Sequence, residues 1–230
     1  VQTPNDGADQ TQVNAWIQKD AAQTILAAAG QDLAALTKAA QAEGFKPVPL
    51  NVKADLSFDN AIRKSVSNNV VGILPGKTKR DEYVLYSGHW DHLGRCTADA
   101  RGDDICNGAV DNATGIAALT ALAKANAQAG PTERSQVFLA VTLEESGLLG
   151  SEYYAQNPVF PLNRTVGGVN MDALAPGGRT RDYAMVGGDK SDLNDLFRTA
   201  IAARGLVESP EETPEKGHYY RSDHFSLAKR

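Results

Sequence analysis

The sequence predicts an α/β protein, a three-layer α/β/α sandwich built around a mostly parallel mixed sheet. Two observations lead to this fold class. Residues 83–88 (YVLYSG) and 136–143 (QVFLAVTL) are nearly continuous apolar runs, as in strands that are buried on both faces. Segments with helical periodicity separate these runs, and strands that alternate with helices are typical of a parallel sheet covered on both sides.

Composition limits the classes to which the protein can belong. The chain has 230 residues, a formal net charge of -5 and a hydrophobic content of 42%, which fits one globular domain with room for a small appendage. No apolar run approaches the ~18 residues of a membrane span. The mild acidity provides no basic surface for nucleic acid. We therefore expect neither a membrane nor a nucleic acid as partner, and the sequence leaves the oligomeric state open.

The first third of the chain predicts a separate helical segment. Residues 1–10 are polar. Residues 13–30 and 31–44 show helical periodicity, and each stretch is closed by a glycine, Gly30 or Gly44. Residues 50–76 alternate as strands do, with a second apolar stretch at residues 70–74. We therefore divide the chain into a helical segment, residues 1–50, and a second domain, residues 51–230.

Helices and strands then alternate along the second domain. The helix expected at residues 111–130 carries an apolar stripe of Ile116, Leu119 and Leu122. After the strand at 136–143, the pattern predicts a helix at 147–157, strands at 165–174 and 183–188, and a helix at 191–205.

The chain contains two cysteines, Cys96 and Cys106, which enclose a loop rich in glycine and aspartate. Their closeness, and the lack of other cysteines, favours a disulfide, which would place the protein in the periplasm or outside the cell. The alternative is two free thiols in a cytosolic protein. Zinc ligation by this pair is disfavoured, because their spacing is not of the CxxC type.

Acidic residues and histidines follow several of the predicted strands. His89 and Asp91 come after the first strand, Glu144 and Glu145 after the second, and Asp172 after the third. Asp111 precedes a helix, and His224 lies near the end of the chain. Each residue alone would be read as a helix cap, a turn residue or a structural histidine. In a parallel sheet, however, the carboxyl ends of the strands meet at one edge, where active sites lie.

A metal site accounts for this coincidence. Adjacent glutamates beside a buried strand repel each other unless a cation compensates them, and histidines combined with carboxylates suit zinc. We take His89, Asp111, Glu145, Asp172 and His224 as ligands. Their three carboxylates, two Zn²⁺ ions and one bridging hydroxide sum to zero charge, whereas one zinc leaves an excess of negative charge.

Two carboxylates remain outside this ligand set. Glu144 is predicted to be the general base that takes a proton from the attacking water. Asp91 is predicted to accept the second ring N–H of His89 and so to fix its tautomer. We interpret His92 as a polar neighbour and His218 as a surface residue. Tyr219 and Tyr220 precede a ligand and are assigned equally to oxyanion stabilisation or to ordinary packing.

Five motifs, GHWDHLG, GAVDNATG, LEESGLLGS, NMDAL and RSDHFS, resemble in order the metal-site motifs of the secreted bacterial zinc aminopeptidases. Relatives of these dizinc exopeptidases include glutamate carboxypeptidases and glutaminyl cyclases. The resemblance covers about residues 57–230. It implies His89 and Asp172 on one zinc, Glu145 and His224 on the other, and Asp111 between them. It also implies Glu144 as the acid/base, Asp91 as the support of His89, and a cis peptide bond between Asp111 and Asn112.

The resemblance also bears on the ends of the chain and on the reaction. Residues 1–50 resemble the tail of an inserted protease-associated domain, and the strand and helix that follow the last histidine in the family are expected to be missing here. The implied activity is aminopeptidase cleavage of peptides. The alternatives are a carboxypeptidase or glutaminyl cyclase on the same scaffold, or a non-catalytic peptidase homologue.

Overall fold

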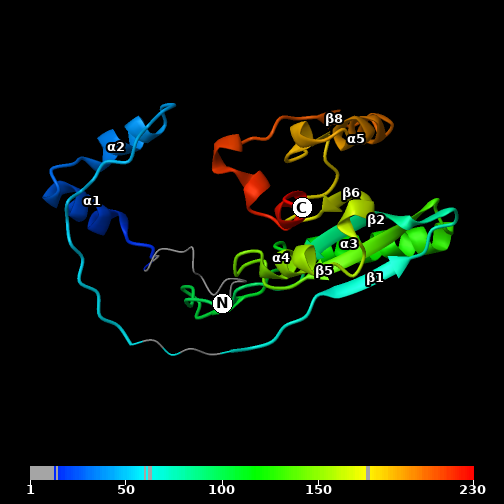
Figure 1. The fold of residues 1–230 in the computed structure, drawn as a ribbon, viewed down its shortest axis with the longest axis horizontal. Coiled ribbons are helices and arrows are strands. Elements are labelled where there is room, and N and C mark those ends of the chain that lie inside the picture. Colours follow the sequence, from blue (N-terminus) through cyan, green and yellow to red (C-terminus); the bar gives the residue numbers. More distant parts are fainter. Residues whose placement is uncertain (1–12, 14, 60, 62–63, 175–176) are drawn as a thin grey trace. The chain divides into compact units, whose positions relative to one another are not determined.

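The computed structural model describes residue 13, residues 15–59, residue 61, residues 64–174 and residues 177–230. The chain divides into two compact units, Val1–Lys64 and Ser65–Arg230 (Figure 1). This division falls later in the chain than residue 50, where the helical segment was expected to end. The two units are described separately below.

The N-terminal unit contains two helices, α1 (Lys19–Ala28) and α2 (Leu33–Ala40). The Asp32 carboxylate caps α2 by accepting a hydrogen bond from the Ala35 N–H at 2.7 Å. Gly30 adopts a left-handed φ of 69° after α1, as its place at the end of the helical pattern suggested. Both predicted helices are therefore present in this unit.

The strands expected before residue 70 are not present. Residues 51–59, 61 and 64–69 contain no strand, so that part of the prediction is wrong for these described residues. Alternation of apolar and polar residues favours a strand only where a neighbouring strand can pair with it. The apolar stretch at residues 70–74 does pair, and it forms β1 (Val70–Leu74).

The main sheet of the C-terminal unit has the strand order β1-β5-β2-β6. Its other strands are β2 (Lys79–His89), β5 (Arg134–Val141) and β6 (Thr165–Asn170). Strands β5, β2 and β6 are parallel, and β1 pairs antiparallel to β5. The prediction of a mostly parallel mixed sheet is therefore confirmed, and the carboxyl ends of three strands meet at one edge.

The remaining elements surround this sheet. The helices are α3 (Ala113–Ala129), α4 (Leu149–Gln156), α5 (Leu193–Ala202) and α6 (His224–Ala228). Short strands form two further pairs, β3 (Gly94–Arg95) with β4 (Ile105–Cys106) and β7 (Asp182–Tyr183) with β8 (Val207–Glu208). The described residues also form the 3-10 turns η1 (Leu162–Arg164), η2 (Gly188–Lys190), η3 (Pro214–Lys216) and η4 (His218–Tyr220).

The strand predicted at residues 183–188 is largely wrong. Only Tyr183 of that range is extended, in β7, which pairs with β8 outside the main sheet. Gly187 has a left-handed φ of 76°, and the 3-10 turn η2 begins at the next residue. A chain that turns at a left-handed glycine cannot continue as a regular strand.

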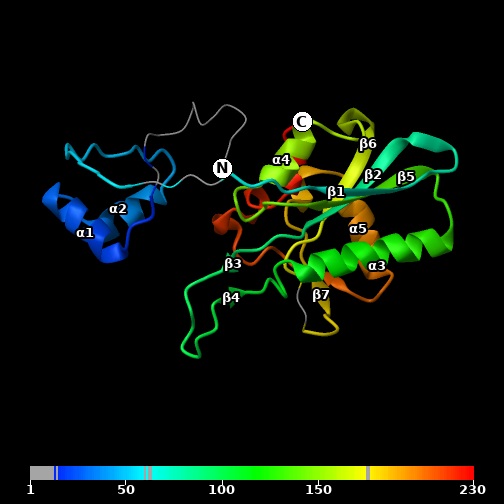
Figure 2. The same cartoon turned by 90° about the horizontal axis from the view of Figure 1, so that it is seen from below.

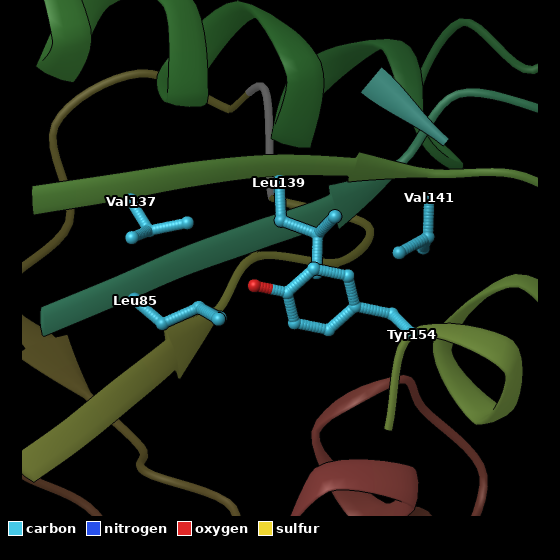
Figure 3. Packing of buried hydrophobic residues seen from close by; sticks show 5 residues of the cluster. All are labelled: Leu85, Val137, Leu139, Val141 and Tyr154. Atoms are coloured by element: carbon cyan, nitrogen blue, oxygen red, sulfur yellow. The ribbon is translucent and has the colours of Figure 1, made fainter. Parts of the chain in front are cut away.

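Strand β5 carries apolar side chains on both faces because successive residues of a strand point to opposite sides. Val137, Leu139 and Val141 pack with Leu85 and Tyr154 on one face (Figure 3). The cluster on the other face contains Phe138 of β5 and Leu119 of α3, with Ile116 and Leu122 packed against it. The predicted apolar stripe of α3 is thus confirmed.

These clusters define the layers. Helix α3 covers one face of the sheet, and α4 lies on the other (Figure 2). Tyr154 of α4 and Leu227 of α6 belong to the cluster on this second face. The prediction of a three-layer α/β/α arrangement is confirmed. Across the described part of the chain, every helix is too short or too polar to span a membrane.

Glu152 joins α4 to the C-terminal helix α6. Its carboxylate accepts hydrogen bonds from Lys229 Nζ at 2.8 Å and Arg230 Nη2 at 3.1 Å. The hydrogen bond from Lys229, followed by that from Gln156, lowers the pKa of Glu152. Because these ion pairs of Glu152 lie near the surface, they contribute on the order of 0.5–1 kcal/mol to the free energy of folding.

We expect Glu152→Gln to lower the free energy of unfolding by about that amount near neutral pH. A carboxylate whose pKa is depressed in the folded state stabilises the fold above its unfolded pKa of about 4.3, and this contribution is lost as pH falls through the folded pKa. Urea unfolding near neutral pH and below about pH 3 measures the change. Glu133→Gln, which removes a more exposed pair with Lys79, is the control. If wild type and Glu152→Gln differed in free energy of unfolding by the same amount at both pH values, the effect would not come from the ionised Glu152 carboxylate.

Candidate metal centre

The predicted site residues lie at the edge of the sheet where the three parallel strands end. His89 is the last residue of β2, Asp172 follows β6 by two positions, and Glu144 follows β5 by three. Asp111 lies in the loop before α3. Parallel pairing of β5, β2 and β6 brings these strand ends to one side of the molecule.

The first cluster consists of His89, Asp111 and Asp172. His89 is 0% exposed. Its Nε2 lies 3.0 Å from Asp111 Oδ1 and 3.2 Å from Asp172 Oδ1. Its Nδ1 lies 3.1 Å from the backbone carbonyl oxygen of Asp91. Both ring nitrogens of one imidazole therefore face acceptors, which requires a cation at this position, either a second ring proton or a metal ion.

The electrostatics agree with this geometry. Burial opposes the charged form of the His89 ring, but hydrogen bonds to Asp172 and Asp91 and the charges of Asp172 and Glu144 raise its pKa to about 11. The side chains alone thus favour positive charge strongly at this point. The same environment attracts a divalent cation.

The second cluster consists of His92, Asp111 and Glu145. His92 Nδ1 lies 2.6 Å from Glu145 Oε1. Asp111 belongs to both clusters, which fits the bridging position that the resemblance implies. From the sequence we interpreted His92 as a polar neighbour and took His224 as the ligand, but in the structure His92 belongs to the group that could hold a metal ion.

His224 belongs to neither of these two clusters. Burial lowers the pKa of its ring, although the Asp172 charge opposes this. The ring packs edge-on against Tyr219 with centroids 4.8 Å apart. The role of His224 as a ligand stays a prediction.

Buried polar atoms test whether a metal fits here. Among the described residues, His224 Nε2 is buried and has no hydrogen-bond partner, whereas the buried atoms Asp111 Oδ1 and His92 Nδ1 face the His89 ring and the Glu145 carboxylate as ion pairs. A buried polar atom without a partner costs about 1–3 kcal/mol. Imidazole nitrogens and carboxylate oxygens are the ligands that zinc takes in proteins. The donor set therefore fits zinc.

A bend in the backbone brings the glutamate pair to this edge. Leu143, just before the pair, has a left-handed φ of 57°, which an L-residue adopts only at an energetic cost. The Asp91 carboxylate fixes the bend, because it accepts hydrogen bonds from the Glu144 N–H at 3.1 Å and from the Glu145 N–H at 3.4 Å.

This arrangement changes our interpretation of Asp91. Its carboxylate lies 3.7 Å from His89 Nδ1, whereas its backbone carbonyl lies at 3.1 Å. The carbonyl is therefore the nearer partner of the His89 ring, and the carboxylate, which also faces that ring, holds the glutamate turn. The sequence shows that Asp91 follows His89 by two positions, but it cannot show that the Asp91 carboxylate accepts hydrogen bonds from the Glu144 and Glu145 N–H groups.

Glu144 lies in neither cluster of possible ligands. Burial raises its pKa to about 7, the charge of His89 opposes this, and the charges of Asp223 and Asp172 add to the rise. A carboxyl group with a pKa near neutral can both accept and release a proton under ordinary conditions. This property suits the acid/base role that we predict.

Asn112 fixes Asp111 relative to Asp172, and the sequence analysis did not single it out. The bond between Asp111 and Asn112 is cis, as the resemblance implies. The Asn112 side chain accepts hydrogen bonds from the N–H groups of Gly115 and Ala173 and donates one to the Met171 carbonyl. It therefore ties the start of α3 to the segment that carries Asp172.

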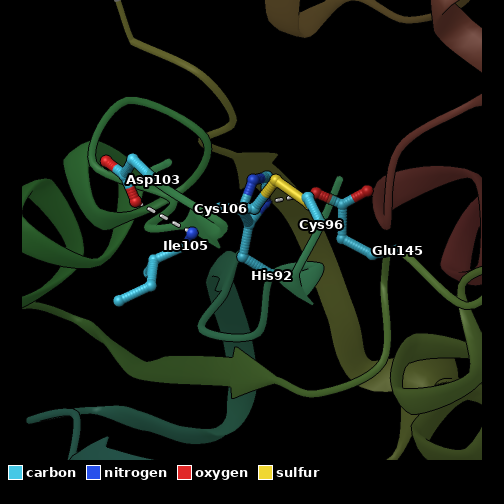
Figure 4. The surroundings of a disulfide bond; sticks show 6 residues. All are labelled: His92, Cys96, Asp103, Ile105, Cys106 and Glu145. Atoms are coloured by element: carbon cyan, nitrogen blue, oxygen red, sulfur yellow. Dashed lines mark hydrogen bonds and ion pairs between the residues drawn. A yellow bond between two sulfur atoms is a disulfide. The ribbon is translucent and has the colours of Figure 1, made fainter. Parts of the chain in front are cut away.

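The disulfide between Cys96 and Cys106 is present, and it joins β3 to β4 (Figure 4). It closes a loop beside the second cluster, where the figure shows His92 and Glu145 facing each other. Gly108 lies directly against His92, since a Cβ added there would meet the His92 Cβ at 2.9 Å. The segment just after the disulfide loop therefore packs tightly against one member of the cluster.

The two tyrosines before His224 pack against each other and against Phe225. Tyr219 also contacts the His224 ring, whereas Tyr220 is exposed. His218 is also exposed and lies 3.1 Å from Thr213 Oγ1, which agrees with its interpretation as a surface residue.

A model of the family described as Peptidase family M28 matches residues 69–230. The mouse (Mus musculus) protein Aminopeptidase NAALADL1 is 29% identical over 138 residues, which cover 56% of this chain and 17% of that protein.

Solved structures share the fold. A zinc aminopeptidase from Bacillus subtilis, BSAP, aligns with a TM-score of 0.53 and 21% identity, over 70% of this chain and 37% of that chain. A glutaminyl cyclase from Bacteroides thetaiotaomicron aligns with a TM-score of 0.52 and 19% identity, over 70% of this chain and 60% of that chain. The matched part of this chain corresponds to less than a fifth of the length of the curated relatives, 17% for Aminopeptidase NAALADL1 and 18% for a probable zinc metalloprotease from Pyrenophora teres.

Proposed function

The chain belongs to peptidase family M28, and from this premise we propose that it is a zinc-dependent aminopeptidase that removes the N-terminal residue of peptides. One observation carries the proposal. Two clusters of histidine and carboxylate side chains share Asp111, and the possible ligand atoms of each cluster lie within 4.8 Å of one another.

We propose that two zinc ions occupy this centre. His89 and Asp172 would hold one ion, and Glu145 with His224 would hold the other. His92 Nδ1 lies 2.6 Å from Glu145 Oε1, beside the second position. Asp111 would contact both. When bound, zinc would supply Lewis-acid activation of the scissile carbonyl and of water.

The chain's own residues would move the protons. Glu144 lies beside the clusters with a pKa of about 7, so it would take a proton from the attacking water and pass it to the leaving amine. The Asp91 carboxylate would hold Glu144 in place through its backbone N–H. The peptide substrate therefore meets a proton acceptor fixed at the sheet edge.

A panel of substrates tests this function. We expect hydrolysis of aminoacyl-p-nitroanilides with a free amino group and none of their N-acetylated forms. A chelator should abolish the activity, and added Zn²⁺ should restore it. Cleavage of N-blocked peptides from a free carboxyl end would show a carboxypeptidase instead. Cyclisation of N-terminal glutamine would show a glutaminyl cyclase, and one zinc per chain at saturation would point the same way.

We further propose a periplasmic or secreted location. The Cys96–Cys106 disulfide supports it, because disulfides persist in oxidising compartments. Alkylation of protein taken directly from its natural source, followed by mass spectrometry, should find neither thiol free.

A further inference from the structure

A chain of three hydrogen bonds leads through the protein to Asp172. Ser87 Oγ donates to Asn170 Oδ1 at 2.7 Å. Asn170 Nδ2 donates to Ser222 Oγ at 2.7 Å, and Ser222 Oγ donates to Asp172 Oδ2 at 2.6 Å. The four side chains come from β2, from β6 and its end, and from the segment just before α6.

The direction of this chain is fixed by its chemistry. A serine hydroxyl has one hydrogen, and an amide group has an acceptor end and a donor end. The Asp172 carboxylate can only accept, so the single hydroxyl hydrogen of Ser222 points to it. Ser222 must then accept from the amide nitrogen of Asn170, which leaves the Asn170 carbonyl to accept from Ser87.

The two oxygens of Asp172 are thereby distinguished. Oδ2 accepts the hydrogen bond from Ser222, whereas Oδ1 faces His89 Nε2 at 3.2 Å. The backbone after Asp172 belongs to no helix or strand, and Asn112 holds it through the Ala173 N–H, which places the residue but not the direction of its carboxylate. The orientation of the carboxylate therefore depends on its side-chain partners.

We propose that Ser222 is a positioning residue of the metal centre, holding Asp172 so that Oδ1 is the atom offered to a cation. This inference rests on the proposed function, because it presumes that the first cluster binds a metal ion. The segment that contains Ser222 and His224 would then have two roles. The stretch that supplies His224 would orient a carboxylate of the first cluster as well.

Zinc affinity is the test, measured on the full chain by competition with a chromophoric chelator. We expect Ser222→Ala to weaken binding of one zinc ion by about 10- to 100-fold, the usual effect of removing a partner of a ligand. Ser222→Thr keeps the hydroxyl and should restore affinity to within about threefold of wild type. Melting temperatures of all variants show whether they are folded.

Ser226→Ala is the matched control. Ser226 lies in α6, is 0% exposed, and its Oγ has no hydrogen-bond partner among the described residues. Its removal should leave zinc affinity unchanged. An equal loss in Ser222→Ala and Ser226→Ala would mean that packing of the segment matters and the hydroxyl does not, which overturns the proposal.

A double variant tests whether the hydrogen bonds act in series, from Asn170 through Ser222 to Asp172. If Asn170 acts through Ser222, then Asn170→Ala should weaken zinc binding in the wild-type chain but add little to Ser222→Ala. Full additivity would refute the relay. Unchanged zinc affinity in Ser222→Ala would refute the role of Ser222 alone, whereas failure of the unmodified chain to bind Zn²⁺ would refute the proposed function and this inference together.

Discussion

Glu144→Gln is expected to abolish peptide hydrolysis while leaving zinc bound. Glutamine has nearly the size of glutamate but cannot take up a proton, and loss of a general acid/base typically lowers kcat by about 10²- to 10⁴-fold. The side chain lies outside both clusters of possible ligands, so metal affinity should stay within about twofold of wild type. Rates with a chromogenic aminoacyl substrate and zinc content by atomic absorption measure the two effects.

The neighbouring residue provides the contrast. Glu145 Oε1 lies 2.6 Å from His92 Nδ1 in the second cluster, so Glu145→Gln should lose one zinc ion as well as activity. The two adjacent variants therefore separate proton transfer from metal binding. Zinc loss in Glu144→Gln comparable to that in Glu145→Gln would make Glu144 a ligand and contradict the role assigned to it.

Asp111→Ala is expected to remove both zinc ions and to reduce activity to background. Asp111 is the residue that the two clusters share, so its loss opens both at once. Its side chain is 49% exposed, and the metal-free variant should therefore fold with a melting temperature close to that of metal-free wild type. Equilibrium dialysis against Zn²⁺ gives the stoichiometry, and circular dichroism gives the melting temperature.

Asp172→Ala is the comparison for this variant. Asp172 belongs to the first cluster only, so its loss should weaken one zinc ion and retain the other. If Asp111→Ala kept one ion with wild-type affinity, Asp111 would not bridge the two positions. The centre would then consist of two independent sites.

Much of the fold could be predicted because hydrophobic patterns reflect burial. The strand pattern at residues 136–143 became β5, whose side chains fill cores on both faces, and Ile116, Leu119 and Leu122 formed the predicted buried stripe of α3. The pattern was misleading at residues 183–188, where a left-handed glycine turns the chain. It was also misleading before residue 70, where the alternating residues found no strand to pair with.

The sequence by itself determined which chemistry is available at the sheet edge. Parallel strands must end on one side, so residues that follow them, such as His89 and Asp172, had to lie near each other. Tertiary structure alone decided the partners. Asp91 holds the glutamate turn, His92 lies against Glu145, and Ser222 orients Asp172. These contacts join residues about 50 positions apart, and their hydrogen-bond directions depend on side-chain placement to within a few tenths of an ångström, which no pattern along the chain encodes.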